Sequence, residues 1–178
     1  VVSIVGAPGE RSEEAGHDLT YQDDSGLVNG LEMPASLYAD MGGSLFTTEA
    51  VLQALLWRQR PGRSQGQGVF HQVALSDAAA YLALPRTWGL TLPSGDVGGA
   101  HAGYKVYPCK NGRVALAALE PHFARRLCEA AGLPQQAAMQ MHKRSTHTAI
   151  AQFLATQTRA QLDKLATAKD IPLLTLPR

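Results

Sequence analysis

The sequence predicts an α/β fold followed by a smaller α+β unit, and three patterns support this. Residues 1–6 form a Val- and Ile-rich run that ends in glycine, which is typical of a buried strand. A helical pattern over 35–60 and a strand pattern over 69–75 follow it. Farther along, two apolar runs flank Asn111-Gly112, the strongest short-range signal for a β-hairpin. The change from strand–helix alternation to a hairpin followed by helices predicts two structural units.

We expect residues 1–72 to be part of a large α/β domain, 73–102 to be a linker and 103–178 to be a small α+β domain. The linker assignment depends on the stretch 85–103, which holds five glycines and two prolines and shows no helical or strand period. Such a composition is typical of a linker or an active-site loop. A short Ala-rich helix over 78–84 is predicted just before it.

The helix predicted over 35–60 contains the adjacent glycines Gly42 and Gly43. Its larger apolar residues recur at three- and four-residue steps, which predicts one buried stripe: Leu37, Met41, Leu45, Phe46, Val51, Leu52, Leu55 and Leu56. Each glycine costs about 1 kcal/mol relative to alanine inside a helix. Either the helix therefore starts after the pair, or something approaches its backbone there.

Helices should follow the hairpin in the second half. Pro121 suits the first turn of a helix that ends near Gly132. Two further helices are predicted over 146–156 and 158–168, and a last strand over 171–176. A loop is also predicted over 61–68, between the long helix and the second strand.

The composition is that of a globular protein. The 178 residues are 45% hydrophobic and 17% charged, with a formal net charge of +1. This balance argues against a nucleic-acid partner, and no apolar run approaches the roughly 20 residues of a membrane span. With no leader pattern, we expect a cytoplasmic protein with no membrane partner. Cys109 and Cys128 lack the spacing of a zinc site, so we expect no metal centre and assign both thiols to the core.

Three ionisable residues are candidates for chemistry. His17 lies in a glycine-flanked loop, Asp40 at the expected N-terminal end of the long helix, and Glu120 directly before Pro121. A histidine and a carboxylate together suit acid–base catalysis near neutral pH. Each has a simpler explanation, because Asp40 can be a helix N-cap, His17 a surface residue and Glu120 a first-turn acid. The basic stretch 142–147 is predicted to be a solvated loop rather than a phosphate or metal site.

Six sequence blocks, in order, resemble the family III CoA-transferases and their relatives, the α-methylacyl-CoA racemases (CaiB/BaiF family). The blocks are GHDLTYQ (16–22), MPASLYADMGG (33–43), RPGRSQGQ (60–67), VALSDAA (73–79), GYKVY to NG (103–112) and ALEPHF (118–123). The resemblance implies the remainder of a Rossmann-like large domain, plus the small domain. It also implies a partial chain that lacks the N-terminal CoA-binding half, which agrees with a start in mid-strand at Val1.

The resemblance also implies roles for the candidate residues. In the racemase branch, His17 and Asp40 would face opposite sides of the α-carbon of an acyl-CoA, so that one removes a proton and the other returns one. Glu120 would support the histidine. The backbone of Gly42 and Gly43 would lie close to the substrate, where nearby helix amides could stabilise an oxyanion. In the transferase branch, Asp40 would attack the thioester carbonyl to form a mixed anhydride and then an aspartyl-CoA thioester.

Three functional hypotheses stay open. The presence of His17 favours racemase-like proton transfer over CoA transfer between acids. The third hypothesis is a catalytically silent chain that depends on a separate polypeptide for the N-terminal half. The resemblance further implies acyl-CoA as a substrate, no permanently bound cofactor, and an interlocked homodimer.

Overall fold

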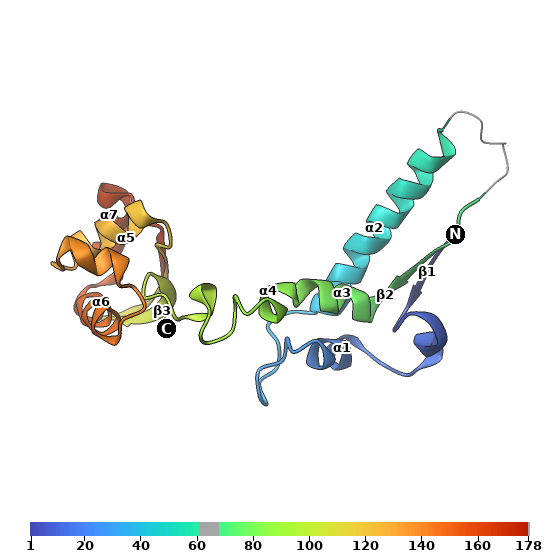
Figure 1. Cartoon of the computed structure of the whole chain (residues 1–178), viewed down its shortest axis with the longest axis horizontal. Coiled ribbons are helices and arrows are strands. Elements are labelled where there is room, and N and C mark those ends of the chain that lie inside the picture. Colours follow the sequence, from blue (N-terminus) through green and yellow to red (C-terminus); the bar gives the residue numbers. More distant parts are fainter. Residues whose placement is uncertain (61–67, 178) are drawn as a thin grey trace. The chain divides into compact units, whose positions relative to one another are not determined.

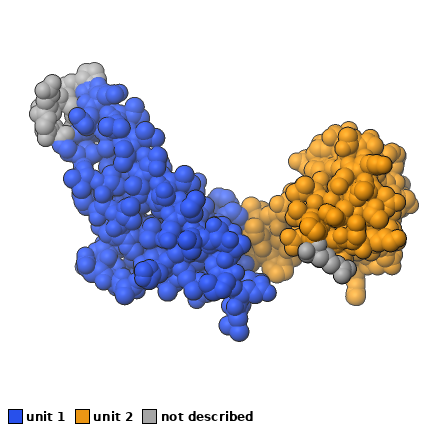
Figure 2. All heavy atoms as spheres, turned by 180° about the vertical axis from the view of Figure 1, so that it is seen from behind, with its two compact units in different colours: residues 1–88 blue, residues 89–178 orange. Residues whose placement is uncertain are grey.

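The computed structural model describes residues 1–60 and 68–177, and the chain divides into two compact units. Unit 1 comprises residues 1–88 and unit 2 comprises residues 89–178 (Figure 2). Unit 1 contains a two-stranded sheet and unit 2 a separate three-stranded sheet. The division after Trp88 lies inside the stretch predicted to be a linker. The loop predicted over 61–68 falls almost entirely outside the described residues.

Unit 1 is built on a parallel strand pair joined through a long helix (Figure 1). Strand β1 (Val2–Val5) pairs in parallel with β2 (His71–Ala74), and α2 (Tyr38–Arg58) lies between them in the sequence. Parallel strands need such a crossover, and these three elements confirm the predicted strands and long helix. The other elements of unit 1 are η1 (Gly9–Glu13), α1 (Asp18–Asp24), α3 (Leu75–Leu82) and α4 (Leu84–Thr87).

His17 lies in a loop, as predicted, but helix α1, which begins directly after it, was not predicted. The amide of His17 donates a hydrogen bond to Thr20 Oγ1 at 3.1 Å, and that hydroxyl donates back to the carbonyl of His17 at 2.8 Å. This reciprocal pair starts the helix. With only seven residues, α1 is too short for an apolar period to reveal it.

The glycine pair of α2 lies where this helix packs against α3. A Cβ atom added to Gly42 would lie 3.1 Å from Cβ of Ala78, and one added to Gly43 would lie 2.3 Å from Cδ2 of Leu75. The two helices therefore approach more closely than larger residues would allow. Of the two explanations predicted for the pair, a close approach to the helix backbone is confirmed, because α2 begins before the glycines.

The apolar stripe of α2 is not buried, which corrects the prediction. The residues that α2 buries are small, namely Ala39, Gly42, Gly43 and Ala50. Most of its large apolar residues, and Leu37 before it, are exposed: Leu37, Tyr38, Met41, Leu45, Val51, Leu52, Leu55 and Leu56. The spacing of apolar residues identified a stripe, but spacing alone could not show that another side of the helix makes the contacts.

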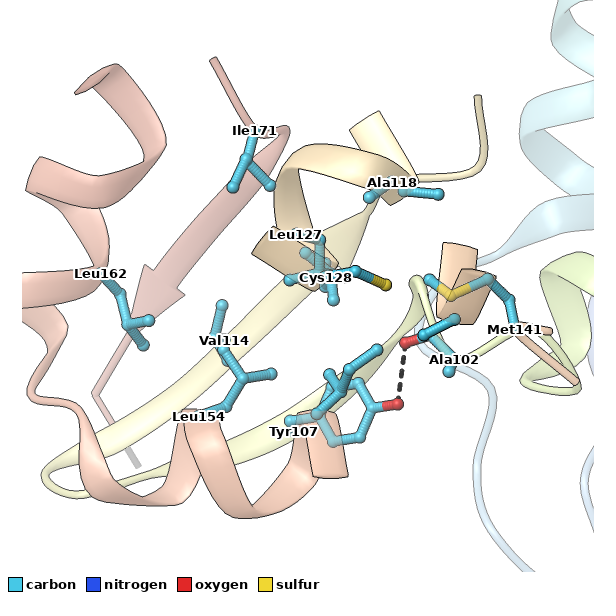
Figure 3. Packing of buried hydrophobic residues seen from close by; sticks show 14 of the residues in the cluster. Ala102, Tyr107, Val114, Ala118, Leu127, Cys128, Met141, Leu154, Leu162 and Ile171 are labelled. Atoms are coloured by element: carbon cyan, nitrogen blue, oxygen red, sulfur yellow. Dashed lines mark hydrogen bonds between the residues drawn. The ribbon is translucent and has the colours of Figure 1, made fainter. Parts of the chain in front are cut away.

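Unit 2 carries the hydrophobic core. Strands β3 (Tyr104–Cys109), β4 (Gly112–Ala117) and β5 (Leu173–Leu176) form an antiparallel sheet, which confirms the predicted hairpin and last strand. Side chains from this sheet and from the helices meet in one cluster, which includes Val114, Leu127, Leu154, Leu162 and Ile171 (Figure 3). By contrast, the buried apolar side chains described in unit 1 are alanines and Val73.

The helices of unit 2 follow the predicted order. Helix α5 (Pro121–Ala130) begins with proline at its first position, and α6 (Arg144–Thr156) and α7 (Arg159–Lys169) follow it. Two short 3-10 helices, η2 (Asp96–Gly98) and η3 (Gln135–Met139), were not predicted.

Cys109 and Cys128 are free thiols buried in the core of unit 2, as predicted. Within the described parts of the chain, no helix is long and apolar enough to cross a membrane.

Candidate active site

A buried carboxylate joins α1 to the first turn of α2. Asp18 is only 6% exposed, and its Oδ1 accepts hydrogen bonds from the amides of Ala39 at 2.8 Å and Asp40 at 3.0 Å. Leu37, the N-cap residue of α2, has no side-chain acceptor to offer these amides. Asp18 therefore caps α2 from a distant position in the sequence, in place of the N-cap side chain.

Gln22 holds the other oxygen of this carboxylate. Its Nε2 donates to Oδ2 of Asp18 and, at 3.0 Å, to the carbonyl of Ser36. Gln22 is fully buried, and its Oε1 has no hydrogen-bond partner within the described structure. The amide nitrogen thus fixes both Asp18 and the chain that leads into α2.

This network brings two of the predicted site residues to the N-terminal end of α2. His17 is the N-cap residue of α1 and directly precedes Asp18, while Asp40 lies in the first turn of α2 and donates its amide to Asp18. Both residues are exposed. The alternative that Asp40 is the N-cap is wrong, because the helix begins at Tyr38 after Leu37. The expected position near the start of the helix is confirmed.

The carboxylate of Asp40 makes no hydrogen bond to any other described residue and is open to solvent. Its place in the first turn is electrostatically favourable, because the N-terminal end of a helix carries partial positive charge. A first-turn acid stabilises many helices, so this position by itself assigns no chemistry. What the structure adds is the connection of Asp40 to the segment of His17 through Asp18.

Glu120 lies in unit 2, apart in the chain from the other two candidates. It is the exposed N-cap residue of α5, and its carbonyl accepts the amide of Ala124 at 2.9 Å while its side chain makes no capping bond.

The backbone around Gly42 and Gly43 is buried against α3. The atoms nearest to an added side chain belong to Leu75, Ala78 and Leu82. Helix packing therefore accounts for the glycine pair without a bound molecule. Closeness of this backbone to a substrate stays a prediction.

A histidine cluster in unit 2 was missed in the sequence. His142 Nε2 lies 2.6 Å from Asp96 Oδ1, and His147 Nε2 lies 2.8 Å from the carbonyl of Ala100. The ring of His101 meets that of His142 edge-on, with centroids 5.5 Å apart. Two members of the stretch predicted to be a solvated loop thus bind the segment around η2. No local signal linked these residues, because they come from separate parts of the chain.

His101 lies in the same cluster, beside His142. It is buried, and its Nδ1 accepts the amide hydrogen of Gly103 at 3.1 Å. Burial lowers the pKa of His101, His142 and His147 lower it further, and Asp96 opposes them. Among the described residues, no three His, Cys, Asp or Glu side chains are placed to hold a metal ion. Through His142 and His147, the cluster joins the start of α6 to the segment around η2.

Asp18 and Gln22 are the site residues that sequence reasoning missed. Their spacing of four residues is that of a side-chain pair on one helix, which would have been a signal had α1 been predicted. An apolar cavity of about 820 Å³ also lies in unit 2, between the sheet and the segment 93–99, and its lining includes none of the predicted catalytic residues.

Comparison with known structures places the fold. The chain is 19% identical to Rv3272 from Mycobacterium tuberculosis with a TM-score of 0.74, covering 97% of this chain and 49% of that one. It is 20% identical to a CaiB/BaiF family protein from Brucella suis with a TM-score of 0.66, covering 97% of this chain and 51% of that one. The chain thus spans about half the length of these structures, and at such identity they show the shared fold alone.

The family is shown by a match over nearly the whole sequence. The model of CoA-transferase family III matches residues 1–176, which include all three predicted catalytic residues. The resemblance noted from the six sequence blocks is therefore confirmed, and the chain belongs to CoA-transferase family III.

Proposed function

We propose that this chain acts on acyl-CoA thioesters and moves a proton between the two faces of the α-carbon, with His17 and Asp40 as the acid–base pair. The observation that carries the proposal is the Asp18 network, which connects the segment of His17 to the first turn of α2, where Asp40 lies. Family membership supports the substrate class, and the exposure of both side chains leaves them accessible.

The reaction needs two groups because the proton must leave one face of the α-carbon and return to the other. One residue starts unprotonated and removes the α-proton, and the electron pair moves into the thioester carbonyl to give an enolate. The other starts protonated and delivers its proton to the α-carbon from the opposite face. Each turnover therefore exchanges the protonation states of His17 and Asp40. In the same proposal, Glu120 supports the histidine, and the backbone of Gly42 and Gly43 lies close to the substrate.

CoA transfer between carboxylic acids is the second candidate. The open carboxylate of Asp40 favours it, because that oxygen is free to act as a nucleophile. Attack on the thioester carbonyl would release CoA thiolate and leave a mixed anhydride. The thiolate would then attack the Asp40 carbonyl, which releases the first acid and leaves an aspartyl-CoA thioester for a second carboxylate.

Deuterium incorporation tests the first candidate. A 2-methylacyl-CoA is incubated with the protein in deuterated water, and deuterium at the α-carbon is measured by mass spectrometry. We expect uptake with the unmodified chain and its loss in both His17→Ala and Asp40→Asn. Asp77→Asn, which changes an exposed first-turn acid of α3, serves as the matched control and should keep the uptake. Uptake that survives loss of both His17 and Asp40 would refute the assignment.

The same variants separate the two reactions. If the chain is a transferase, His17→Ala should retain exchange of CoA between an acyl-CoA and a labelled carboxylic acid, while Asp40→Asn should abolish it. If it moves protons, both variants lose α-deuteration and the unmodified chain shows no CoA exchange.

A partner-dependent chain is the candidate of a different class. The exposed apolar residues of α2 favour it, because contiguous apolar surface of this kind usually contacts another protein. This apolar surface would be covered by a second copy of the chain in an interlocked homodimer, or by a separate polypeptide that supplies CoA contacts. Light scattering together with a dye that binds exposed apolar surface tests this. A stable monomer without dye binding would contradict it.

A further inference from the structure

We propose that Asp18 is a positioning residue that fixes Asp40 relative to His17. This inference rests on the proposed function of that pair. Asp18 does not need to touch the substrate. It acts through its hydrogen bonds to the backbone of α2 and through its place directly after His17 in the chain.

Two bonds to one oxygen determine where the first turn of α2 lies. Oδ1 of Asp18 accepts the amides of two consecutive residues, Ala39 and Asp40, so it constrains both the position and the direction of the turn. Bonds from amides to an ionised carboxylate are stronger than bonds between neutral groups, and burial strengthens them further. The first turn is therefore held to α1 rather than free to fray.

Gln22 prevents the carboxylate from rotating away. Its Nε2 bonds the second oxygen of Asp18, and its other hydrogen reaches the carbonyl of Ser36, just before α2. The buried Oε1 of Gln22 has no hydrogen-bond partner in the described structure. The side-chain amide is therefore oriented so that its nitrogen makes both of its hydrogen bonds while its oxygen makes none. The network thus favours one fixed geometry of Asp18.

Nothing else described in unit 1 holds the Asp40 side chain. Its carboxylate is exposed and forms no hydrogen bond to a described residue, and the N-cap residue Leu37 contributes no capping bond. The position of the carboxylate therefore follows from the backbone that Asp18 anchors. An error of about 1 Å in the position of a reacting group can reduce a rate about 100-fold, so this anchor bears directly on turnover.

The test uses Asp18→Ala and Asp18→Asn in the full chain. Asparagine keeps an oxygen acceptor for the two amides but loses the charge, whereas alanine removes the acceptor. Asp77→Ala is the matched control, because Asp77 is an exposed acid in the first turn of α3 that makes no bond to α2. All variants are measured at a temperature where circular dichroism shows them to be folded.

Two measurements are made on each variant. Backbone hydrogen exchange by NMR reports on residues 39 and 40, and the deuterium assay gives kcat and KM for an acyl-CoA. In Asp18→Ala we expect exchange at these two amides to accelerate at least about tenfold, and kcat to fall about 10- to 100-fold with KM changed less than about twofold. Asp18→Asn should lie between this variant and the unmodified chain, and Asp77→Ala should match the unmodified chain.

The outcomes separate the positioning role from simple stability. A folded Asp18→Ala with unchanged exchange at residues 39 and 40, or with unchanged kcat, would overturn the proposal. If Asp18→Ala fails to fold, Asp18→Asn decides by the same two measurements. If the unmodified chain shows no α-deuteration, the proposed function fails, while amide exchange still shows whether Asp18 holds the backbone of Asp40.

Discussion

The carboxylate of Asp18 lies 3.0 Å from the backbone nitrogen of Asp40, and this bond connects two helices that begin far apart in the sequence. Asp18 opens α1 directly after His17, and Asp40 belongs to the first turn of α2. One buried carboxylate therefore connects the two backbone segments that carry the exposed side chains of His17 and Asp40.

Replacing Asp40 by asparagine should separate chemistry from stability. We expect Asp40→Asn to reduce turnover at least about 100-fold, because the amide cannot accept or donate the proton. The free energy of unfolding should change by less than about 1 kcal/mol, because only the interaction of an exposed charge with the helix end is lost. The deuterium assay and thermal unfolding measure the two effects. Normal turnover combined with a larger loss of stability would show that Asp40 serves the helix alone.

A larger side chain at Gly42 should force α2 and α3 apart. Ala78 Cβ lies 3.1 Å from the position of an added Cβ, and this neighbour cannot rotate away. We expect Gly42→Leu to lower the free energy of unfolding by about 1–3 kcal/mol, measured by urea denaturation. Ser44→Leu, at an exposed position of the same helix, should change it by less than about 0.5 kcal/mol. Equal effects of the two changes would contradict the close packing of the helices.

The free energy of unfolding should decrease as the pH falls below the ordinary histidine pKa of 6.5, because of His101. Its pKa is lowered from 6.5 in the folded state, chiefly by burial. The unfolded chain therefore binds a proton at a pH where the folded chain does not, so lowering the pH through this window favours unfolding. His142 and His147 also face the ring and resist a further positive charge, whereas Asp96 favours it.

The variant His101→Gln tests this pH dependence. Glutamine offers an oxygen acceptor to the amide of Gly103 but does not titrate. Urea denaturation between about pH 5 and 7.5 should show a flatter profile than that of the unmodified chain. The control His122→Gln, at an exposed position in α5, should leave the profile unchanged. A profile that keeps its slope in His101→Gln would show that other groups cause it.

The buried hydroxyl of Tyr107 should contribute to the stability of unit 2. It donates a hydrogen bond of 2.8 Å to the carbonyl of Ala102, a fully buried residue (Figure 3). We expect Tyr107→Phe to cost about 1–3 kcal/mol, because that carbonyl would lose its partner. Burial also raises the pKa of Tyr107 to about 12, so the stability of the unmodified chain should fall between the usual tyrosine pKa of 10.0 and that value.

Unfolding followed across alkaline pH measures this second effect. The unfolded chain releases the phenolic proton at lower pH than the folded chain, which drives unfolding as the pH rises. The slope should be smaller in Tyr107→Phe. An unchanged slope would mean that Tyr107 ionises as easily in the folded chain as in the unfolded one.

The sequence alone determined the elements whose signals are local. The hairpin followed from Asn111-Gly112 between two apolar runs, and α5 followed from Pro121 at its first position. The six sequence blocks identified the family. The sequence also predicted that Asp40 lies near the start of a helix. In these cases, residues close together in the chain decide the structure, because a turn or a helix end involves only a few neighbours.

Only the tertiary structure decided which residues meet. The capping of α2 by Asp18 spans 21 residues to Ala39, and the histidine cluster joins His142 to Asp96 across 46 residues. The exposure of the apolar stripe of α2 could not be predicted either, because periodicity shows that a helix has an apolar side but not which side packs. Small residues such as Gly42 set the approach of α3, and that approach depends on the surface of another helix rather than on the spacing within α2.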